Sequence, residues 1–102
     1  MRNDVFVEIV EFYPEKRHKN PKFMGTMHAY IEIGPVKFDM RGIRIFRQGK
    51  KVNIFYPNFT ALDQGEKVRY PLLSLLDTNL NQQMKDQIIE KGRAYMYENK
   101  LI

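Results

Sequence analysis

Apolar and polar residues alternate with a period of two over much of the first half of the chain, which is the pattern of half-buried β-strands. The run from Asp4 to Tyr13 is rich in β-branched and aromatic residues and is followed by Pro14. A polar, basic segment, Glu15 to Lys22, then has a length that suits a hairpin connection. From Phe23 to Ile33 the alternation is regular, with Met27, Ala29, Ile31 and Ile33 on one face and Thr26, His28, Tyr30 and Glu32 on the other. These patterns predict two antiparallel strands.

A third strand is predicted from Val36 to Phe46, after the turn signal Gly34-Pro35. Strict alternation would bury Arg44 and expose Ile43 and Ile45, so we expect Arg41 and Gly42 to form a β-bulge. The bulge gives an inward series of Val36, Phe38, Met40, Ile43 and Ile45 and an outward series of Lys37, Asp39, Arg41, Arg44 and Phe46.

Gln48-Gly49 is a hairpin signal that predicts a fourth strand directly after the third. A two-residue loop at these positions places Ile45 opposite Val52 and Ile43 opposite Ile54 on the inward face. It places Arg44 opposite Asn53 and Phe46 opposite Lys51 on the outward face, with Phe55 beside them.

The second half of the chain is predicted to contain a loop, a short extended segment and a helix. The loop spans Pro57 to Lys67, and the segment Val68 to Leu76 is interrupted by Pro71. Asp77 or Thr78 is suited to cap a helix from Asn79 to about Asn99, which Gly92 either ends or interrupts. Its apolar stripe consists of Leu80, Met84 and Ile88, then Tyr95 or Met96, with Ile89 beside it. The order predicts an α+β fold, an antiparallel sheet of about four to five strands with one C-terminal helix.

Length and composition add that residues 1–102 form one folded domain. The chain is 43% hydrophobic and 28% charged, unlike a disordered chain. It has no cysteine, which excludes disulfides and thiolate chemistry, and its two histidines lack the spacing of a metal site. The longest apolar run, Pro71 to Leu76, is too short to cross a membrane. Asp4 and Glu8 argue against a signal peptide, so we expect a cytoplasmic protein.

The net charge of +5 is concentrated in one window, from residue 37 to residue 51. Its basic residues are Lys37, Arg41, Arg44, Arg47, Lys50 and Lys51, against Asp39 alone. A second basic cluster comprises Lys16, Arg17, Lys19 and Lys22 against Glu15. Clusters of this kind bind phosphate backbones or acidic surfaces, although a merely solvated face has the same composition.

Aromatic residues interleave with the basic ones on the outward face of the predicted hairpin, where Phe46 and Phe55 lie near Arg44. Cations can meet phosphates there while rings stack on bases, so the face suits nucleic acid. The alternative is that both rings are buried under the helix or a partner subunit.

Catalytic constellations are absent from the sequence. His28 is expected to be partly exposed, about 13 Å along the strand from Glu32. Ser74 is the only serine and has no nucleophile-elbow context, and no Gly-rich phosphate loop is present. We expect Asp39 to be an ion-pair partner. The sequence thus predicts a protein that is not an enzyme and uses neither a cofactor nor a small-molecule substrate.

The run VKFDMRGIRIFRQGKKVNIFYPN, with Val68-Arg69 and the C-terminal amphipathic helix, resembles the SpoVG family (stage V sporulation protein G). The similarity is strongest at Gly42-Ile43-Arg44-Ile45, Gly49 and Tyr56-Pro57-Asn58, and it covers about residues 4 to 97. Asp4-Val5 resembles the family's first strand, and Ala29 to Ile33 its second. The resemblance implies a small bacterial α+β regulator of gene expression that forms a homodimer through its sheet and binds DNA or RNA.

This chain departs from the family pattern in two places. Phe6 and Glu8 stand where family members carry first-strand arginines, and Asn81 and Gln83 stand where they carry cations at the helix start. Arg44 matches the family's strand arginine, and Lys85 is the nearest helix cation. We therefore expect the nucleic-acid contacts to come from the hairpin cluster: Lys37, Arg41, Arg44, Arg47, Lys50 and Lys51, with Lys85. The alternative is a protein-protein interaction module that keeps the fold without binding nucleic acid.

Overall fold

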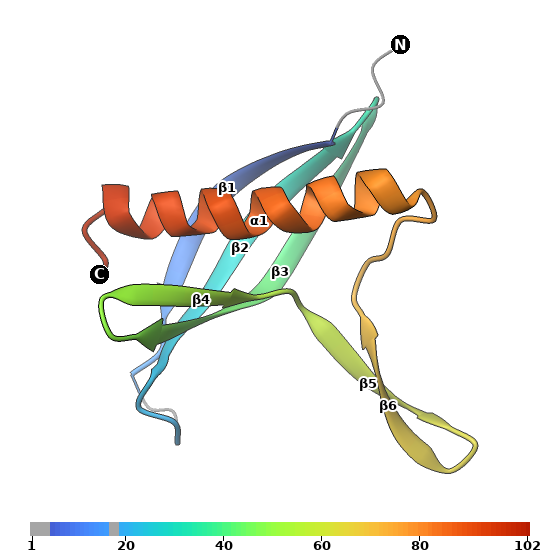
Figure 1. The fold of residues 1–102 in the computed structure, drawn as a ribbon, viewed down its shortest axis with the longest axis horizontal. Coiled ribbons are helices and arrows are strands. Elements are labelled where there is room, and N and C mark those ends of the chain that lie inside the picture. The colour runs from blue at the N-terminus through green and yellow to red at the C-terminus, as the bar shows by residue number, and fades with distance from the viewer. Residues whose placement is uncertain (1–4, 17–18) are drawn as a thin grey trace.

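The computed structural model describes residues 5–16 and 19–102 and has an α+β fold, as predicted (Figure 1). One antiparallel sheet has the order β1-β2-β3-β4, and a separate two-stranded sheet pairs β5 with β6. The bounds are β1 (Val5–Pro14), β2 (Phe23–Ile33), β3 (Val36–Gln48), β4 (Lys51–Phe55), β5 (Asn58–Asp63), β6 (Glu66–Pro71) and α1 (Thr78–Glu98). The predictions for Asp4, Arg17 and His18 lie outside the described residues. Within the described chain, no helix combines the length and hydropathy of a membrane span.

The core lies between α1 and one face of the four-stranded sheet. Asp77 caps the helix, its side chain accepting a hydrogen bond from the backbone nitrogen of Leu80 at 3.0 Å. The buried helix residues are Met84, Ile88, Gly92 and Met96. Gly92 does not end the helix. A β-carbon there would lie 2.6 Å from Cδ1 of Ile54, so the glycine allows the helix to approach the sheet closely.

The predicted bulge in β3 is confirmed. Met27 pairs with Ile43 and Ala29 with Met40, so Arg41 and Gly42 together oppose His28. Gly42 has a φ of 80°. Strand β1, on the other side of β2, also has a bulge: Ile9 pairs with Ala29 and Glu11 with His28, so Val10 is an extra residue there.

Two predictions about individual side chains are wrong. Val36 is 48% exposed rather than inward, because it is the first residue of β3, beside the turn at the end of the sheet. His28 is only 4% exposed, because the bulges on both sides and its contact with Asp39 enclose it.

The hairpin between β3 and β4 turns at Gly49-Lys50 rather than at Gln48-Gly49. Ile45 therefore pairs with Ile54, Phe46 with Asn53, and Arg44 with Phe55. Gly49 takes a φ of 61°, which glycine adopts readily. Because the partner shifts by two residues, each side chain remains on its predicted face.

The predicted loop from Pro57 to Lys67 is also wrong, since its residues form most of a second hairpin, β5 and β6. Gln64 and Gly65 both have positive φ, 51° and 83°, as a tight turn of type I′ requires. This β5–β6 arm packs against no other described helix or strand and projects from the body (Figure 1). Its base is held where Leu72 N donates to Pro57 O at 2.9 Å and the Tyr56 hydroxyl donates to Leu73 O at 2.6 Å.

Candidate nucleic-acid interface

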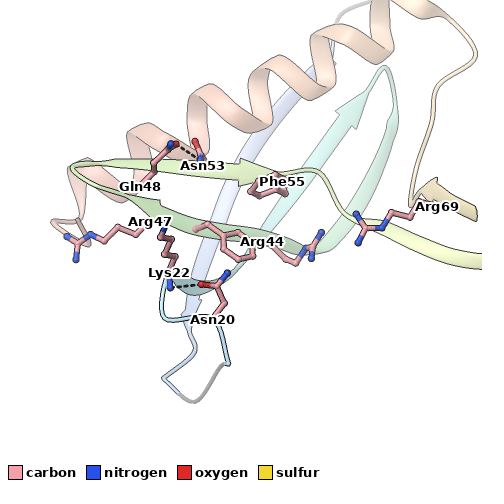
Figure 2. A pocket seen from close by; sticks show the side chains of 9 residues that line it. Asn20, Lys22, Arg44, Arg47, Gln48, Asn53, Phe55 and Arg69 are labelled. Carbon is pink, nitrogen blue, oxygen red and sulfur yellow. Dashed lines mark hydrogen bonds between the residues drawn. The ribbon is translucent and has the colours of Figure 1, made fainter.

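A basic hollow of about 390 Å³ opens where the helix-free face of β3 and β4 meets the β1–β2 loop and the β5–β6 arm (Figure 2). Its lining combines cations, side-chain amides and phenylalanines: Asn20, Lys22, Arg44, Phe46, Arg47, Gln48, Asn53, Phe55 and Arg69. Three segments far apart in the sequence therefore contribute to one site.

The cations of the basic hollow come from all three segments. Arg44 and Arg47 lie on β3, Lys22 lies in the β1–β2 loop and Arg69 lies on β6. The loop is tied to β3, because the backbone nitrogen of Arg47 donates to Lys22 O at 2.7 Å. Figure 2 shows the side chains of Arg44 and Arg69 extending toward one another from opposite sides.

None of these four cations takes part in an ion pair within the described residues, and no described residue that lines the hollow is acidic. Arg93 is different, since its guanidinium donates to the backbone oxygen of Val52 at 3.2 Å. The hollow thus gathers positive charge that no carboxylate of the described chain neutralises, which favours an anionic ligand.

The two phenylalanines of the hollow, Phe46 and Phe55, belong to a series of three rings that Phe23 completes from outside the lining. The ring centroids of Phe23 and Phe46 are 5.1 Å apart, and Phe46 meets Phe55 edge to face at 5.3 Å. Phe46 is half-buried and Phe55 is 46% exposed. Both rings lie on the face opposite the helix, so the alternative that α1 covers them is wrong. Beside them, Asn53 Nδ2 donates to Gln48 Oε1 at 2.7 Å.

The structure brings together only part of the predicted set of contact residues. Arg44 and Arg47 line the hollow, whereas Lys50 and Lys51 are exposed at the hairpin tip next to it. Lys37 lies toward the opposite end of β3, on the order of 30 Å along the strand from Arg47.

The remaining two predicted residues have partners elsewhere. Arg41 Nε donates to Asp39 at 3.3 Å, which bears out the expected ion pair. Lys85 of α1 lies 5.5 Å from the ring centroid of Tyr56, in cation–π geometry. Burial raises the pKa of the Tyr56 hydroxyl to about 12, so that hydroxyl stays protonated and donates to Leu73.

A separate polar cluster surrounds His28 on the helix-free face. Its Nε2 hydrogen-bonds to Oδ1 of Asp39, and its Nδ1 is buried without a hydrogen-bond partner among the described residues. The hydrogen bond to His28 and the nearby Arg41 guanidinium lower the pKa of the Asp39 carboxyl below its usual value. Among the described residues, no group of His, Asp and Glu side chains has the composition of a metal site.

At the helix start, the side chain of Asn81 accepts a hydrogen bond from the backbone nitrogen of Leu75 at 2.9 Å. Asn81, one of the two residues that depart from the SpoVG pattern there, thus helps to hold the segment that enters the helix.

Sequence reasoning did not identify Arg69 and Asn20 as members of the site. Asn20 lies in the predicted connection, and Arg69 lies in the segment that follows the predicted loop. The alternation of Val68 and Tyr70 with Arg69 was the available signal for a strand, but only the path of the chain brings Arg69 to β3.

Comparison with known proteins adds no relative, since no family model, curated protein or solved structure matches this chain. The resemblance to the SpoVG family stays a prediction.

Proposed function

We propose that this protein is a non-enzymatic regulator that binds DNA or RNA through the basic hollow. The observation that carries the proposal is the convergence of Lys22, Arg44, Arg47 and Arg69 on one accessible site, whose described lining contains no acidic side chain. The same lining also contains two phenylalanine rings and three side-chain amides, which suit the bases of a nucleic acid, whereas the cations suit its phosphates. SpoVG-like regulation remains the biological setting that the sequence favours.

Salt dependence is the most direct test of phosphate contacts, because each neutralised phosphate releases bound counterions. Three to four contacts per subunit predict a log-log salt slope of about −3 to −4 on duplex DNA, somewhat less on a single strand. Fluorescence anisotropy at several salt concentrations measures this slope for duplex, single-stranded and RNA probes.

The double variant Arg44→Gln/Arg47→Gln should reduce the magnitude of the slope by nearly two units on duplex DNA. Lys37→Gln/Lys67→Gln is the matched control, because it removes the same net charge from exposed positions outside the hollow. Equal slopes in both double variants would show that only overall charge matters and would reject the hollow as the site.

We also propose a homodimer in which the exposed part of the helix-free face of β1 and β2 is covered. Phe6 is 51% exposed, Val10 is 36% exposed and Tyr30 is 45% exposed. Phe12 of the same strand is not part of this surface, because it is half-buried against the core. Sedimentation equilibrium at micromolar concentration should give twice the mass of the chain, and a monomer would contradict the proposal.

The alternative, a protein-protein interaction module, is supported by the β5–β6 arm. A two-stranded hairpin alone is marginally stable in water, and this one exposes Leu62 to 75% and Phe59 to 48%. Absence of binding to every nucleic-acid probe at low salt would favour this function.

A further inference from the structure

The basic hollow is too small to enclose a double helix, whose phosphates can only lie across its cations, and it has the size of a small-ligand site. Ligand pockets in proteins occupy about 300 to 1,000 Å³, and the hollow measures about 390 Å³. A paired base lies inside the duplex stack and can enter such a hollow only if it is flipped out, at a cost of a few kcal/mol. An unpaired base pays much less of this penalty.

We infer that the hollow accepts one unpaired base of a single-stranded nucleic acid, and that Arg69 of the β5–β6 arm holds the strand from the side opposite Arg44 and Arg47. This inference rests on the proposed function and specifies its ligand. The partly exposed ring of Phe55 is the stacking surface, and the adjoining amides face the edge of the base.

The side chains around Phe55 have the chemistry that a base needs. Asn53 uses its amide nitrogen and Gln48 its oxygen in their mutual hydrogen bond. Among the described residues, the Asn53 oxygen therefore remains available to accept a hydrogen bond from a ligand, and the Gln48 nitrogen to donate one. Both residues line the hollow. Every base has a π-face, and its edge carries donors and acceptors, so the site suits unpaired bases in general.

The position of Arg69 gives the β5–β6 arm a part in binding. The arm packs on no other described helix or strand, yet Arg69 lines a hollow whose other cations belong to the body. A phosphate held between Arg69 and Arg44 would join the arm to the body. Binding should therefore slow amide hydrogen exchange in β5 and β6.

The probes for this inference are a 12-nucleotide oligothymidine, its duplex with oligoadenosine, and an abasic strand of the same length and charge. We expect the single strand to bind at least about fivefold more tightly than the abasic strand, because stacking of one base contributes about 5- to 150-fold in affinity. Phe55→Ala should remove this advantage. Phe59→Ala is the matched control, because Phe59 is 48% exposed but lies on the arm outside the hollow.

Arg69 is tested by Arg69→Gln against Lys67→Gln, which removes a charge two residues further along β6. Arg69→Gln should weaken single-strand binding about tenfold and abolish the slowed exchange in the arm, whereas Lys67→Gln should do neither. Circular dichroism checks that each variant folds, and Phe55→Leu replaces Phe55→Ala if the latter does not.

The outcomes separate this inference from the function on which it rests. Equal affinity for oligothymidine, duplex and abasic strand, with Phe55→Ala unchanged, would overturn the unpaired-base inference and leave a site for phosphates alone. Loss of affinity for all three probes in Arg44→Gln/Arg47→Gln but not in Arg69→Gln would overturn the role of the arm. No binding by the unmodified protein would overturn the proposed function as well.

Discussion

The side chain of Gln87 in α1 holds the backbone of Val7 in β1, accepting its amide hydrogen bond at 3.0 Å. The same side chain donates to Val5 O, and Lys91 Nζ donates to Val7 O at 2.7 Å. At the opposite edge strand, Arg93 donates to Val52 O at 3.2 Å. Side chains of one helix thus occupy backbone groups at both edges of the sheet, where an unprotected strand would pair with another chain.

Replacing Gln87 with alanine should lower the free energy of unfolding by about 1 to 3 kcal/mol, because two partly buried backbone groups lose their partner. Urea unfolding followed by circular dichroism measures the change. Gln82→Ala is the control, because Gln82 is exposed on the same helix and its side chain, within the described part of the chain, bonds only to Asp86. A loss as large in the control would assign the effect to the helix rather than to the strand edge.

Gly42→Val should destabilise the fold by about 1 to 3 kcal/mol through backbone strain, since Gly42 has a φ of 80° and the space around it is open. Gly42→Asn should cost less, because asparagine tolerates positive φ better. The comparison of the two unfolding curves isolates backbone conformation from side-chain volume. Equal stability of the valine variant would contradict the strained bulge.

Gly25→Ala should destabilise more severely, by about 3 kcal/mol or more. An added β-carbon would lie 2.1 Å from the backbone oxygen of Tyr13, in addition to the strain at a φ of 149°. Gly34→Ala provides the matched case, because its φ is 58° and no atom lies within 4 Å. Thermal unfolding should therefore show a much smaller shift for Gly34→Ala.

The Asp39 carboxylate predicts a pH-dependent stability. The hydrogen bond to His28 and the nearby Arg41 lower the pKa of this carboxyl in the folded state. The stabilisation of the fold by the ionised carboxylate is therefore fully present above the unfolded pKa of about 3.8, and it is lost as the pH falls through the lower pKa of the folded state. Asp39→Asn should consequently lose less stability than the unmodified protein between pH 5 and pH 3. Parallel curves of unfolding free energy against pH would contradict this assignment.

Local patterns were sufficient for much of the sheet and for the helix. The alternation in β2 predicted its bounds and its inward residues, and the misfit of Arg44 with strict alternation located the bulge at Arg41 and Gly42. The stripe of Leu80, Met84 and Ile88 likewise predicted the buried side of α1, and of the two residues that the pattern left open after it, Tyr95 and Met96, Met96 is the buried one. These predictions succeed because burial on one face imposes the period of the element on the sequence.

The turn positions and the β5–β6 arm were harder to predict. Gln48-Gly49 and Gly49-Lys50 are both acceptable loops, and they differ by a shift that leaves each side chain on the same face, so hydrophobicity cannot choose between them. The arm buries neither of its faces against the body, so alternation marks only a short part of it, from Val68 to Tyr70.

The cluster of basic residues from 37 to 51 and the phenylalanines between them could be predicted from the sequence, because they all belong to one hairpin of consecutive residues. The composition of the basic hollow depends instead on contacts between distant segments. Lys22, Arg44 and Arg69 belong to three separate segments of the chain, the β1–β2 loop, β3 and β6, and His28 contacts Asp39 across a strand pair. Contacts of this kind depend on the pairing register of the strands and on the direction in which a hairpin projects. The spacing of residues within one segment does not determine either of these.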